Sequence, residues 1–483
     1  MLFKEFGMGK FGGVSDRGSN FVNLRDHMNF KAVNQSRSPT GNECASKSIV
    51  LLLQGPVGPF FNTLARALTA GGYDTLKVNF NGGDWLFSHG KGAVNFCGTT
   101  DAWADWLKAF IKRDAPLVIV LFGDCRPYHR TAIDVARQLG VPVLCFEEGY
   151  ARPHFISCEW GGNNARSPLR IDASQAGDAE TPLEPAEMIR GNLFRSMAME
   201  GIAYYVVKAL GSPFFFGNEH HRNRAILSEV ILWSRNFYRK LRYYPRNNNL
   251  TVDLIENQEG RYFVVALQVH DDQQLPSHGR GWTMERLITE TIRSFARRAD
   301  PAHQLVFKIH PMDRGHKSYR PFVKQLAMLC KCEERVQVLD DGSIGLLIRH
   351  SLGLVTVNST SGLLALNHGK PLLALGDTFY GAEGLANLPK NDALSAAAID
   401  DFWQNPIAPQ KERVQQFVRH MYRKSLINGS FYLRAYIEDT AERVVQRLRA
   451  QLPSTAGAKT VAFLHPDNTT LLEQPDFGSR SGT

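Results

Sequence analysis

The chain contains two successive series of short apolar runs that alternate with amphipathic helical patterns, and this alternation limits the possible folds more than any other feature. The first series begins near Ser48 with SIVLLLQG and ends with PVLCFEEG, and the second begins with YFVVALQ. Short apolar runs separated by helices of period 3.6 are typical of parallel strands covered by helices on both faces. We therefore predict an α/β protein with two Rossmann-like domains.

These patterns divide the chain into six segments. We predict a flexible leader over 1–47, a first Rossmann-like domain over 48–182, a helical linker over 183–250, a second Rossmann-like domain over 251–410, closing helices over 411–452 and a flexible tail over 453–483. Two such domains with closing C-terminal helices are typical of the GT-B architecture of glycosyltransferases, whose active site lies in the cleft between the domains. An epimerase of the same architecture is an alternative, because periodicity does not separate the two classes.

Charge and cysteine content indicate the kind of partner and compartment. The formal net charge is +9 and the isoelectric point is about 9.1, which suits a nucleotide sugar, an anionic lipid surface or nucleic acid. No recognised motif supports nucleic acid, so we do not expect it as a partner. The 7 cysteines are an odd number spread over a long chain, which favours a cytosolic protein with reduced thiols.

Export, membrane spanning and metal binding are not expected. The N-terminal residues include no apolar h-region, which argues against a periplasmic binding protein, and the chain has no run of about eighteen apolar residues. Cys330 and Cys332 lack the two-residue spacer and the second ligand pair of a structural zinc site.

Two acidic turns follow strands that should be neighbours in the first domain. FGDCR places Asp124 and Arg126 after one strand, and FEEGY places Glu147 and Glu148 after the next. Because ligands collect at the carboxyl ends of parallel strands, we expect one carboxylate to act as a nucleophile and another as an acid or base. The alternatives are that Asp124 caps the next helix and that a glutamate pairs with Arg126 or Arg152.

Polar turns after the first two strands are candidates for binding sugar hydroxyls. The glycines of QGPVGPFF let the backbone approach a ligand, and NFNGGD is an Asn/Gly turn, although an ordinary turn explains it nearly as well. Neither is a dinucleotide fingerprint, which argues against NAD. The binding candidates in this domain are Gln54, Gly55, Asn79, Asn81, Asp84, Arg126 and Arg152.

The second domain carries a His-Pro pair and a Ser/Thr turn, each at the predicted end of a strand. KIHP places His310 where it can donate to a phosphate, and STSG precedes the helical run LLALNHG, whose N-terminus can bind the same anion. An ordinary helix cap is the alternative for the Ser/Thr turn. The pattern predicts a nucleotide-sugar site formed by Gln268, Asp271, Lys308, His310, Pro311, Ser359, Thr360, Ser361 and Gly362.

Residues 213–246 interleave Phe, Trp and Tyr with Arg, Lys and His. Such a segment can lie on an anionic membrane surface, with aromatic side chains at the interface and cations towards the headgroups. It can equally form an interdomain helical hairpin with a solvated basic face, and the sequence does not choose between the two.

Together, these motifs resemble the capsule polysaccharide biosynthesis family. The resemblance rests on QGPVGPFF, KVNFNGGD, FGDCRPYH, FEEGYARP, HHR, LQVHDD, KIHP and VNSTSGLLAL, and it extends from about Ser48 to about Leu452. Within the family, the motifs are most similar to β-Kdo transferases that start a poly-Kdo linker on a phospholipid. The resemblance implies a GT-B transferase that uses CMP-Kdo and lysophosphatidylglycerol, with no cofactor. It also implies work at the cytoplasmic face of the inner membrane of a Gram-negative bacterium, beside capsule assembly and ABC export components.

The resemblance also implies roles for the two domains and their residues. The first domain would bind the acceptor and the second CMP-Kdo, since elements similar to the His-Pro pair and the Ser turn hold CMP in bacterial sialyltransferases. Related chain-extending Kdo transferases have Glu-Asp-Gly where this chain has Glu147, Glu148 and Gly149. A β-linked donor and product imply net retention, most simply by double displacement. Glu148 or Asp124 would be the nucleophile, with the other, or Glu147, as acid/base.

Two alternatives to this function remain. A transferase that uses another CMP-sugar, such as CMP-sialic acid, would need the same fold and motifs. A non-catalytic lipid-binding scaffold of the capsule assembly and export complex would keep the fold, but it would need neither the acidic turns nor the donor motifs.

Overall fold

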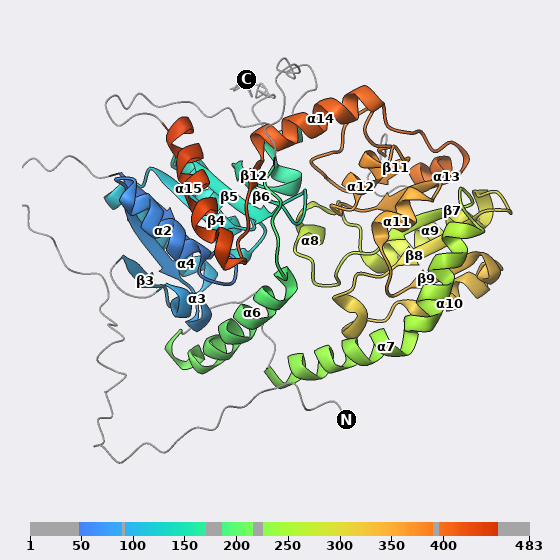
Figure 1. The fold of residues 1–483 in the computed structure, drawn as a ribbon, viewed down its shortest axis with the longest axis horizontal. Helices are drawn as coiled ribbons and strands as arrows, with labels where there is room; N and C mark the ends of the chain where they lie inside the picture. The colour runs from blue at the N-terminus through green and yellow to red at the C-terminus, as the bar shows by residue number, and fades with distance from the viewer. Residues whose placement is uncertain (1–47, 89–91, 171–185, 216–225, 390–395, 453–483) are drawn as a thin grey trace, which may run out of the picture. The chain divides into compact units, whose positions relative to one another are not determined.

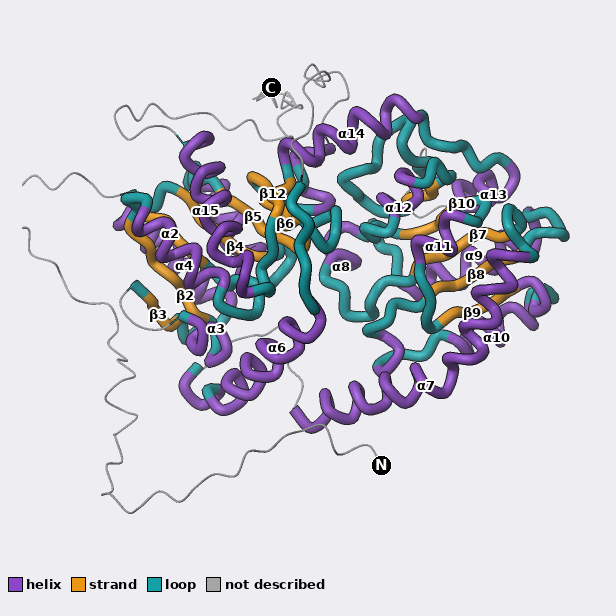
Figure 2. Tube along the Cα trace, viewed as in Figure 1, coloured by secondary structure: helices purple, strands orange, loops and turns teal. Residues whose placement is uncertain are grey.

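The computed structural model describes residues 48–88, 92–170, 186–215, 226–389 and 396–452. The predicted leader and tail, the HHR motif and the end of the first predicted domain lie outside these residues. Within them, the chain builds two separate sheets, and Figures 1 and 2 show the strands of each sheet together with the helices that cover it.

The first sheet has seven strands in the order β12-β6-β5-β4-β1-β2-β3. The strands are β1 (Ile49–Leu52), β2 (Asp74–Asn79), β3 (Ala93–Asn95), β4 (Val118–Phe122), β5 (Val143–Glu148), β6 (Phe155–Trp160) and β12 (Leu426–Asn428). The connecting helices are α2 (Phe60–Ala70), α3 (Gly82–Phe87), α4 (Thr100–Asp114) and α5 (Pro127–Gln138). Strands β1 to β5 pair in parallel in the order expected of a Rossmann-like domain.

The second sheet has five parallel strands in the order β11-β10-β7-β8-β9, which repeats the order of β5-β4-β1-β2-β3. Its strands are β7 (Tyr262–Ala266), β8 (Gln304–Lys308), β9 (Val336–Leu339), β10 (Gly353–Thr356) and β11 (Leu372–Ala374). Its helices are α8 (Gln274–His278), α9 (Met284–Arg298), α10 (Arg320–Leu329), α11 (Ile344–Arg349), α12 (Gly362–Asn367) and α13 (Ala397–Gln404). The prediction of an α/β protein with two Rossmann-like domains is confirmed.

Both faces of each sheet are buried, which explains why the strands are continuous apolar runs. In β1, Val50 and Leu52 pack into one cluster with α2, whereas Leu51 packs into another with α4 and α5. In β7, the side chains of Phe263 and Tyr262 point into two different clusters in the same way. A strand buried on both faces needs apolar residues at every position.

The chain returns to the first domain after completing the second. Helix α14 (Lys411–Lys424) packs into a cluster of the second domain, and β12 then joins the first sheet. Helix α15 (Arg434–Gln451) covers α2 of the first domain. The predicted closing helices are therefore confirmed, and they make the last residues of the fold part of the first domain.

Strand β6 was not predicted, and it runs antiparallel to β5. The loop between the two strands is too short for the helical crossover that a parallel connection requires. Gly149 lies in this loop, where a Cβ atom would be 1.9 Å from the Phe155 carbonyl oxygen. The tight approach of the backbone explains why glycine follows the two glutamates.

Two helices link the sheets, α6 (Leu193–Leu210) and α7 (Ile226–Glu256). Helix α7 contains Pro245, which is exposed, and runs past the predicted domain boundary at residue 250. Among the described helices, none combines the length and the apolar composition that a membrane span requires.

Candidate active site

In both sheets, the strand order reverses between two central strands, and polar side chains meet there at the carboxyl ends. Arg126, after β4, donates to Gln54 Oε1, after β1, over 2.7 Å. Gln268, after β7, donates to Asn358 Oδ1, after β10, over 2.8 Å. Ligands of open α/β sheets bind at these reversal points, so each domain offers one candidate subsite.

The first subsite contains a buried network around Asp84. The Asp84 carboxylate accepts from Gln54 Nε2 at 3.0 and 3.1 Å, from the Tyr204 hydroxyl at 2.9 Å and from the Phe80 amide at 3.0 Å. Asn81 caps α3 through its side-chain oxygen and donates to the Tyr204 hydroxyl over 3.0 Å. The structure thus brings together Gln54, Asn81 and Asp84, three of the residues predicted to bind the acceptor. These side chains are hydrogen-bonded to one another, so the network fixes their positions in the subsite.

Two other first-domain candidates have local roles. Asn79 is fully buried, and its amide donates to the Ser88 carbonyl over 2.8 Å and to Asn95 over 3.1 Å, away from the Asp84 network. Gly55 faces the ring of Phe61, where a Cβ atom would be 2.6 Å from the nearest ring carbon. The glycine therefore allows close packing between the loop after β1 and the start of α2.

Glu147 and Glu148 end β5 with different environments. Glu148 Oε2 lies 2.8 Å from Arg152 Nη1, and the Tyr432 hydroxyl lies 3.4 Å from Glu148 Oε1. Desolvation and the neighbouring Glu148 raise the pKa of Glu147 from 4.5 to about 7, against the attraction of Arg126 and Arg152. An ion pair with Arg152 was one of the two sequence interpretations, and it is present at Glu148. The other carboxyl, Glu147, can exchange a proton near neutral pH.

Asp124 is fully buried and does not cap α5, so the capping alternative was wrong. Its carboxylate instead accepts from the Cys125 thiol and from the Asn163 amide, each at 3.2 Å. Ligand atoms of Asp124, Cys125 and His278 lie within 4.8 Å of one another, which brings the loop after β4 against α8 of the second domain. Burial and the neighbouring Asp124 raise the pKa of the Cys125 thiol, which disfavours the thiolate that a metal would need.

His310 lies at the end of β8, as expected, and its tautomer follows from its contacts. The Met312 amide donates to His310 Nδ1 over 3.3 Å, so the neutral ring carries its proton on Nε2. The side chain is accessible to solvent, but desolvation by surrounding protein atoms, with repulsion from Lys308 and Arg152, lowers its pKa from 6.5 to about 4. His310 is therefore a neutral hydrogen-bond donor at pH 7. The same Arg152 pairs with Glu148, so one cation links the acidic turn with the second domain.

The Ser/Thr turn lies between β10 and α12. Ser361 directly before the helix makes no side-chain capping bond, but the Ser359 hydroxyl accepts from the Ser361 backbone amide over 3.2 Å. Ser361 donates to the Ser359 hydroxyl over 2.9 Å, and the Tyr380 hydroxyl donates to the Ser359 carbonyl over 2.5 Å. A Cβ atom on Gly362 would lie 2.4 Å from the buried Tyr380 ring. Tyr380 thus fixes the turn through a hydrogen bond and through packing of its ring, while Thr360 is exposed to solvent.

Lys308 and Pro311 make hydrogen bonds that stabilise the loop after β8. The Lys308 ammonium is buried and donates to the Ile309 carbonyl over 2.9 Å, and desolvation lowers its pKa to about 8. The Pro311 carbonyl accepts from Asn236 on α7 over 2.9 Å. Asp271 follows β7, and desolvation, with a smaller repulsion from Asp271, raises the pKa of Asp313, against the hydrogen bonds from His270. The structure places Gln268, His310 and the Ser/Thr turn at the ends of three adjacent strands.

Sequence reasoning missed several residues that organise the site. Glu159 is buried and accepts from the hydroxyls of Tyr150, Ser167 and Ser425 and from the amide of Asn163. Burial raises its pKa, against these four donors. The donors come from distant parts of the chain, so no local motif could reveal the group. The ring of Tyr150 also stacks on Phe379 of the second domain, with 4.1 Å between centroids.

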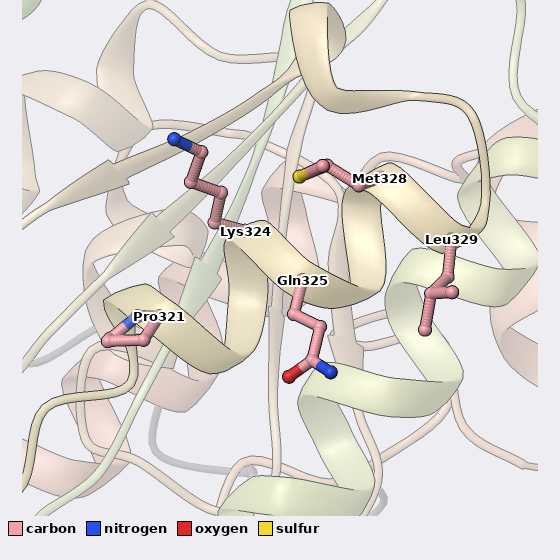
Figure 3. Close-up of a pocket in the computed structure, with 5 residues that line it drawn as sticks. All are labelled: Pro321, Lys324, Gln325, Met328 and Leu329. Atoms are coloured by element: carbon pink, nitrogen blue, oxygen red, sulfur yellow. The ribbon is translucent and has the colours of Figure 1, made fainter.

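A shallow hollow on α10 lies outside this site. Figure 3 shows its lining residues, which are Pro321, Lys324, Gln325, Met328 and Leu329. Helix α10 leads from the end of β8 back towards the start of β9, so its last turn lies at the edge of the sheet opposite to His310.

The chain is similar in sequence to proteins of capsule synthesis. The family model described as "Capsule polysaccharide biosynthesis protein" matches residues 118–432. The "Capsule polysaccharide export protein KpsS" of Escherichia coli is 33% identical over 389 residues, which cover 79% of this chain and 96% of that protein. The "Capsule polysaccharide modification protein LipB" of Neisseria meningitidis serogroup B is 33% identical over 412 residues, which cover 82% of this chain and 94% of that protein.

Among solved structures, a β-Kdo 2,7 transferase, KpsC of Thermosulfurimonas dismutans, superposes with a TM-score of 0.38 and 13% identity, covering 83% of this chain and 99% of that one. The sequence match to KpsS and LipB is far stronger, and with the family model it confirms the resemblance found in the motifs. The chain belongs to the capsule polysaccharide biosynthesis protein family.

Proposed function

We propose that the protein is a retaining β-Kdo transferase that moves Kdo from CMP-Kdo to lysophosphatidylglycerol and so starts the poly-Kdo linker of a capsular polysaccharide. It would act at the cytoplasmic face of the inner membrane, beside capsule assembly and ABC export components. One observation carries the proposal. Glu147, with a pKa of about 7, lies beside the Glu148–Arg152 ion pair, and the charge of Arg152 also acts on His310 of the second domain.

The second domain would bind CMP-Kdo through uncharged hydrogen-bond donors, which come from His310 and from the Ser/Thr turn. The Nε2–H group of His310 would donate to the phosphate, and the Ser359–Gly362 turn would offer hydroxyls and amides on the neighbouring strand ends. Arg152 carries the positive charge that the carboxylate of Kdo requires. Such preorganised donors stabilise negative charge as it develops on the departing CMP, and this step needs no proton.

Two displacements at the anomeric carbon would give net retention. In the first, the Glu148 carboxylate attacks that carbon, and the bond to the phosphate oxygen breaks with its electron pair leaving on CMP. In the second, the acceptor hydroxyl attacks the same carbon, Glu148 leaves as a carboxylate, and ionised Glu147 takes the hydroxyl proton. Asp124, the other candidate nucleophile, is fully buried beneath the site, so Glu148 is the better assignment.

The test is transfer from CMP-Kdo to a fluorescent lysophosphatidylglycerol, read by product mass. The wild-type protein should add one Kdo, and Glu148→Gln should add none. Glu334→Gln is the matched control, because Glu334 is an exposed carboxylate directly before β9, at the edge of the second sheet opposite to the carboxyl ends of its strands. Undiminished transfer by Glu148→Gln would refute the role of this residue.

A donor panel separates the remaining interpretations. Transfer from CMP-sialic acid, but not from CMP-Kdo, would replace the donor assignment. Failure to bind either nucleotide sugar would favour a scaffold without catalytic activity, since a scaffold needs no donor.

A further inference from the structure

Several polar side chains of helix α7 face the protein. Asn236 and Asn247 are 7% and 2% exposed. Asn236 donates to the Pro311 carbonyl over 2.9 Å, and Arg239 donates to the Arg314 carbonyl over 2.8 Å. The side of α7 that packs on the second domain is therefore polar between Asn236 and Asn247, unlike that of an ordinary surface helix, whereas Leu250 and Leu254 of its last turns pack on the core.

The other side of α7 is apolar and faces outward. Its exposed side chains include Ile231, Trp233, Phe237, Tyr238, Leu241 and Tyr244, each between 45% and 65% exposed. At 3.6 residues per turn, Trp233, Phe237, Leu241 and Tyr244 form one stripe. A continuous stripe of large apolar side chains on the outside of a helix indicates an interaction surface.

Helix α6 contacts α7 and also exposes an apolar outer side. Its inward side is mixed, because Leu193 and Met197 pack against the core of the first domain, while Glu200 and Tyr204 are 8% and 5% exposed. Its outward stripe is Met199, Ile202, Val206 and Leu210, which are 64, 63, 40 and 72% exposed. We call the two outward stripes together the α6–α7 apolar face.

Cations border the exposed apolar side of α7, and acids are absent from this part of the helix. Arg235, Arg242 and Arg246 lie beyond Tyr238 and Ile231 on one edge of the exposed apolar residues, and Lys240 lies beside Trp233 on the other edge; all four cations are exposed. The sequence from residue 230 to residue 252 contains no Asp or Glu. Apolar and aromatic side chains bordered by arginine and lysine match the layered structure of an anionic lipid surface. A protein partner would have to supply a similar acidic rim around an apolar centre.

We propose that the α6–α7 apolar face binds the surface of an anionic phospholipid bilayer. Both helices also hold the candidate site, because Tyr204 of α6 binds Asp84 and Asn236 of α7 binds the loop of His310. Docking on lipid would thus fix both subsites relative to the bilayer that contains the acceptor. The inference deepens the proposed function, on which this last point rests, but lipid binding itself requires neither CMP-Kdo nor transfer.

The direct test is co-sedimentation of the full-length protein with vesicles. Vesicles of phosphatidylglycerol and phosphatidylethanolamine should bind the protein, and vesicles of phosphatidylcholine alone should bind it much less. The double variant Phe237→Ser/Leu241→Ser should lower the partition coefficient by about tenfold or more, because two apolar side chains that the bilayer would bury are lost. Lys240→Glu/Arg242→Glu should also lower binding to anionic vesicles. Added salt should make this variant and the wild-type protein more alike in binding, because salt screens the attraction between the cations and the lipid headgroups.

The matched control is Met328→Ser/Leu329→Ser, which removes two exposed apolar side chains from α10, 56% and 72% exposed. This control should bind vesicles like the wild-type protein. Circular dichroism of each variant identifies unfolding, and the pair Ile202→Ser/Val206→Ser on α6 provides an independent second test. Wild-type binding by both stripe variants, or equal binding to neutral and anionic vesicles, would overturn the proposal.

Two further readouts separate this inference from its alternatives. With a short-chain, water-soluble acceptor, Phe237→Ser/Leu241→Ser should keep wild-type transfer, whereas transfer to vesicle-embedded acceptor should fall. Vesicle binding without any transfer would support the surface and refute only the proposed reaction. A wild-type dimer in sedimentation velocity that dissociates in the stripe variants, without vesicle binding, would assign the face to a second copy of the chain and overturn the lipid proposal.

Discussion

Replacing Tyr204 by phenylalanine should loosen α6 from the first domain. The Tyr204 hydroxyl donates to Asp84 over 2.9 Å and accepts from Gln54 and Asn81, each at 3.0 Å. Burial and the neighbouring Asp84 raise the pKa of this hydroxyl, so it remains a donor throughout the usual pH range. Its ring packs on Gly83, where a Cβ atom would be 2.6 Å away, and phenylalanine preserves that contact.

The magnitude follows from the groups that lose a partner. Asp84 would retain Gln54 and the Phe80 amide, but it would lose one hydrogen bond to a charged acceptor, worth about 1.5–3 kcal/mol. The Asn81 amide would also lose a buried acceptor. We expect local opening of α6 to become easier by about 2 kcal/mol or more, which corresponds to about thirtyfold faster amide exchange.

Hydrogen exchange measured by mass spectrometry checks this expectation. Peptides from α6 should exchange faster in Tyr204→Phe, while peptides from β8 and α10 in the second domain serve as an internal control. Tyr205→Phe is the matched variant, since its neighbouring hydroxyl is outside the Asp84 network. Unchanged exchange in α6 would refute the argument that this hydroxyl anchors the helix.

Three shorter predictions concern the candidate site. If Glu147 is the base, the transfer rate should rise as pH increases through about 7, because the ionised form accumulates there, and Glu147→Gln should remove this step from the pH–rate profile. Gly362→Ala should weaken CMP binding in titration calorimetry, because the new methyl group would press on the buried Tyr380 ring, and such overpacking typically costs about 1–3 kcal/mol. Gly345→Ala is its control and should bind CMP normally, since the nearest atom to its Cβ position is 3.9 Å away. His310→Ala should reduce CMP affinity by the same factor at pH 6 and at pH 8, because desolvation keeps the ring neutral at both pH values. The comparison between the two proteins cancels the ionisation of the CMP phosphate itself, and a clearly different factor at pH 6 would contradict the neutral ring.

The strands and most helices could be predicted because each is encoded locally. Helix α9 (Met284–Arg298) follows the apolar periodicity of its own sequence, and the Thr283 side chain caps its first turn. His310 and Ser359 could be placed at strand ends for the same reason, since each motif directly follows an apolar run. Local patterns therefore gave both sheets and the positions of the candidate donor residues.

The partners of these residues could not be predicted, because they come from distant parts of the chain. Tyr204 reaches Asp84 across 120 positions, and Ser425 reaches Glu159 across 266. No spacing rule connects such residues. Strand β6 was missed for a different reason: Ser157 and Glu159 interrupt its sequence, FISCEW, so it lacks the continuous apolar run of the other buried strands.

The return of the chain to the first domain has a consequence for synthesis on the ribosome. Residues of α2 and β1 are covered by Phe431, Ile437 and Val444, which leave the ribosome only after the whole second domain has been made. Until then, one face of the nascent first sheet lacks its cover and its last strand, β12. A fragment that stops before β12 should therefore be prone to aggregation, even though it contains all the parallel strands of its sheet.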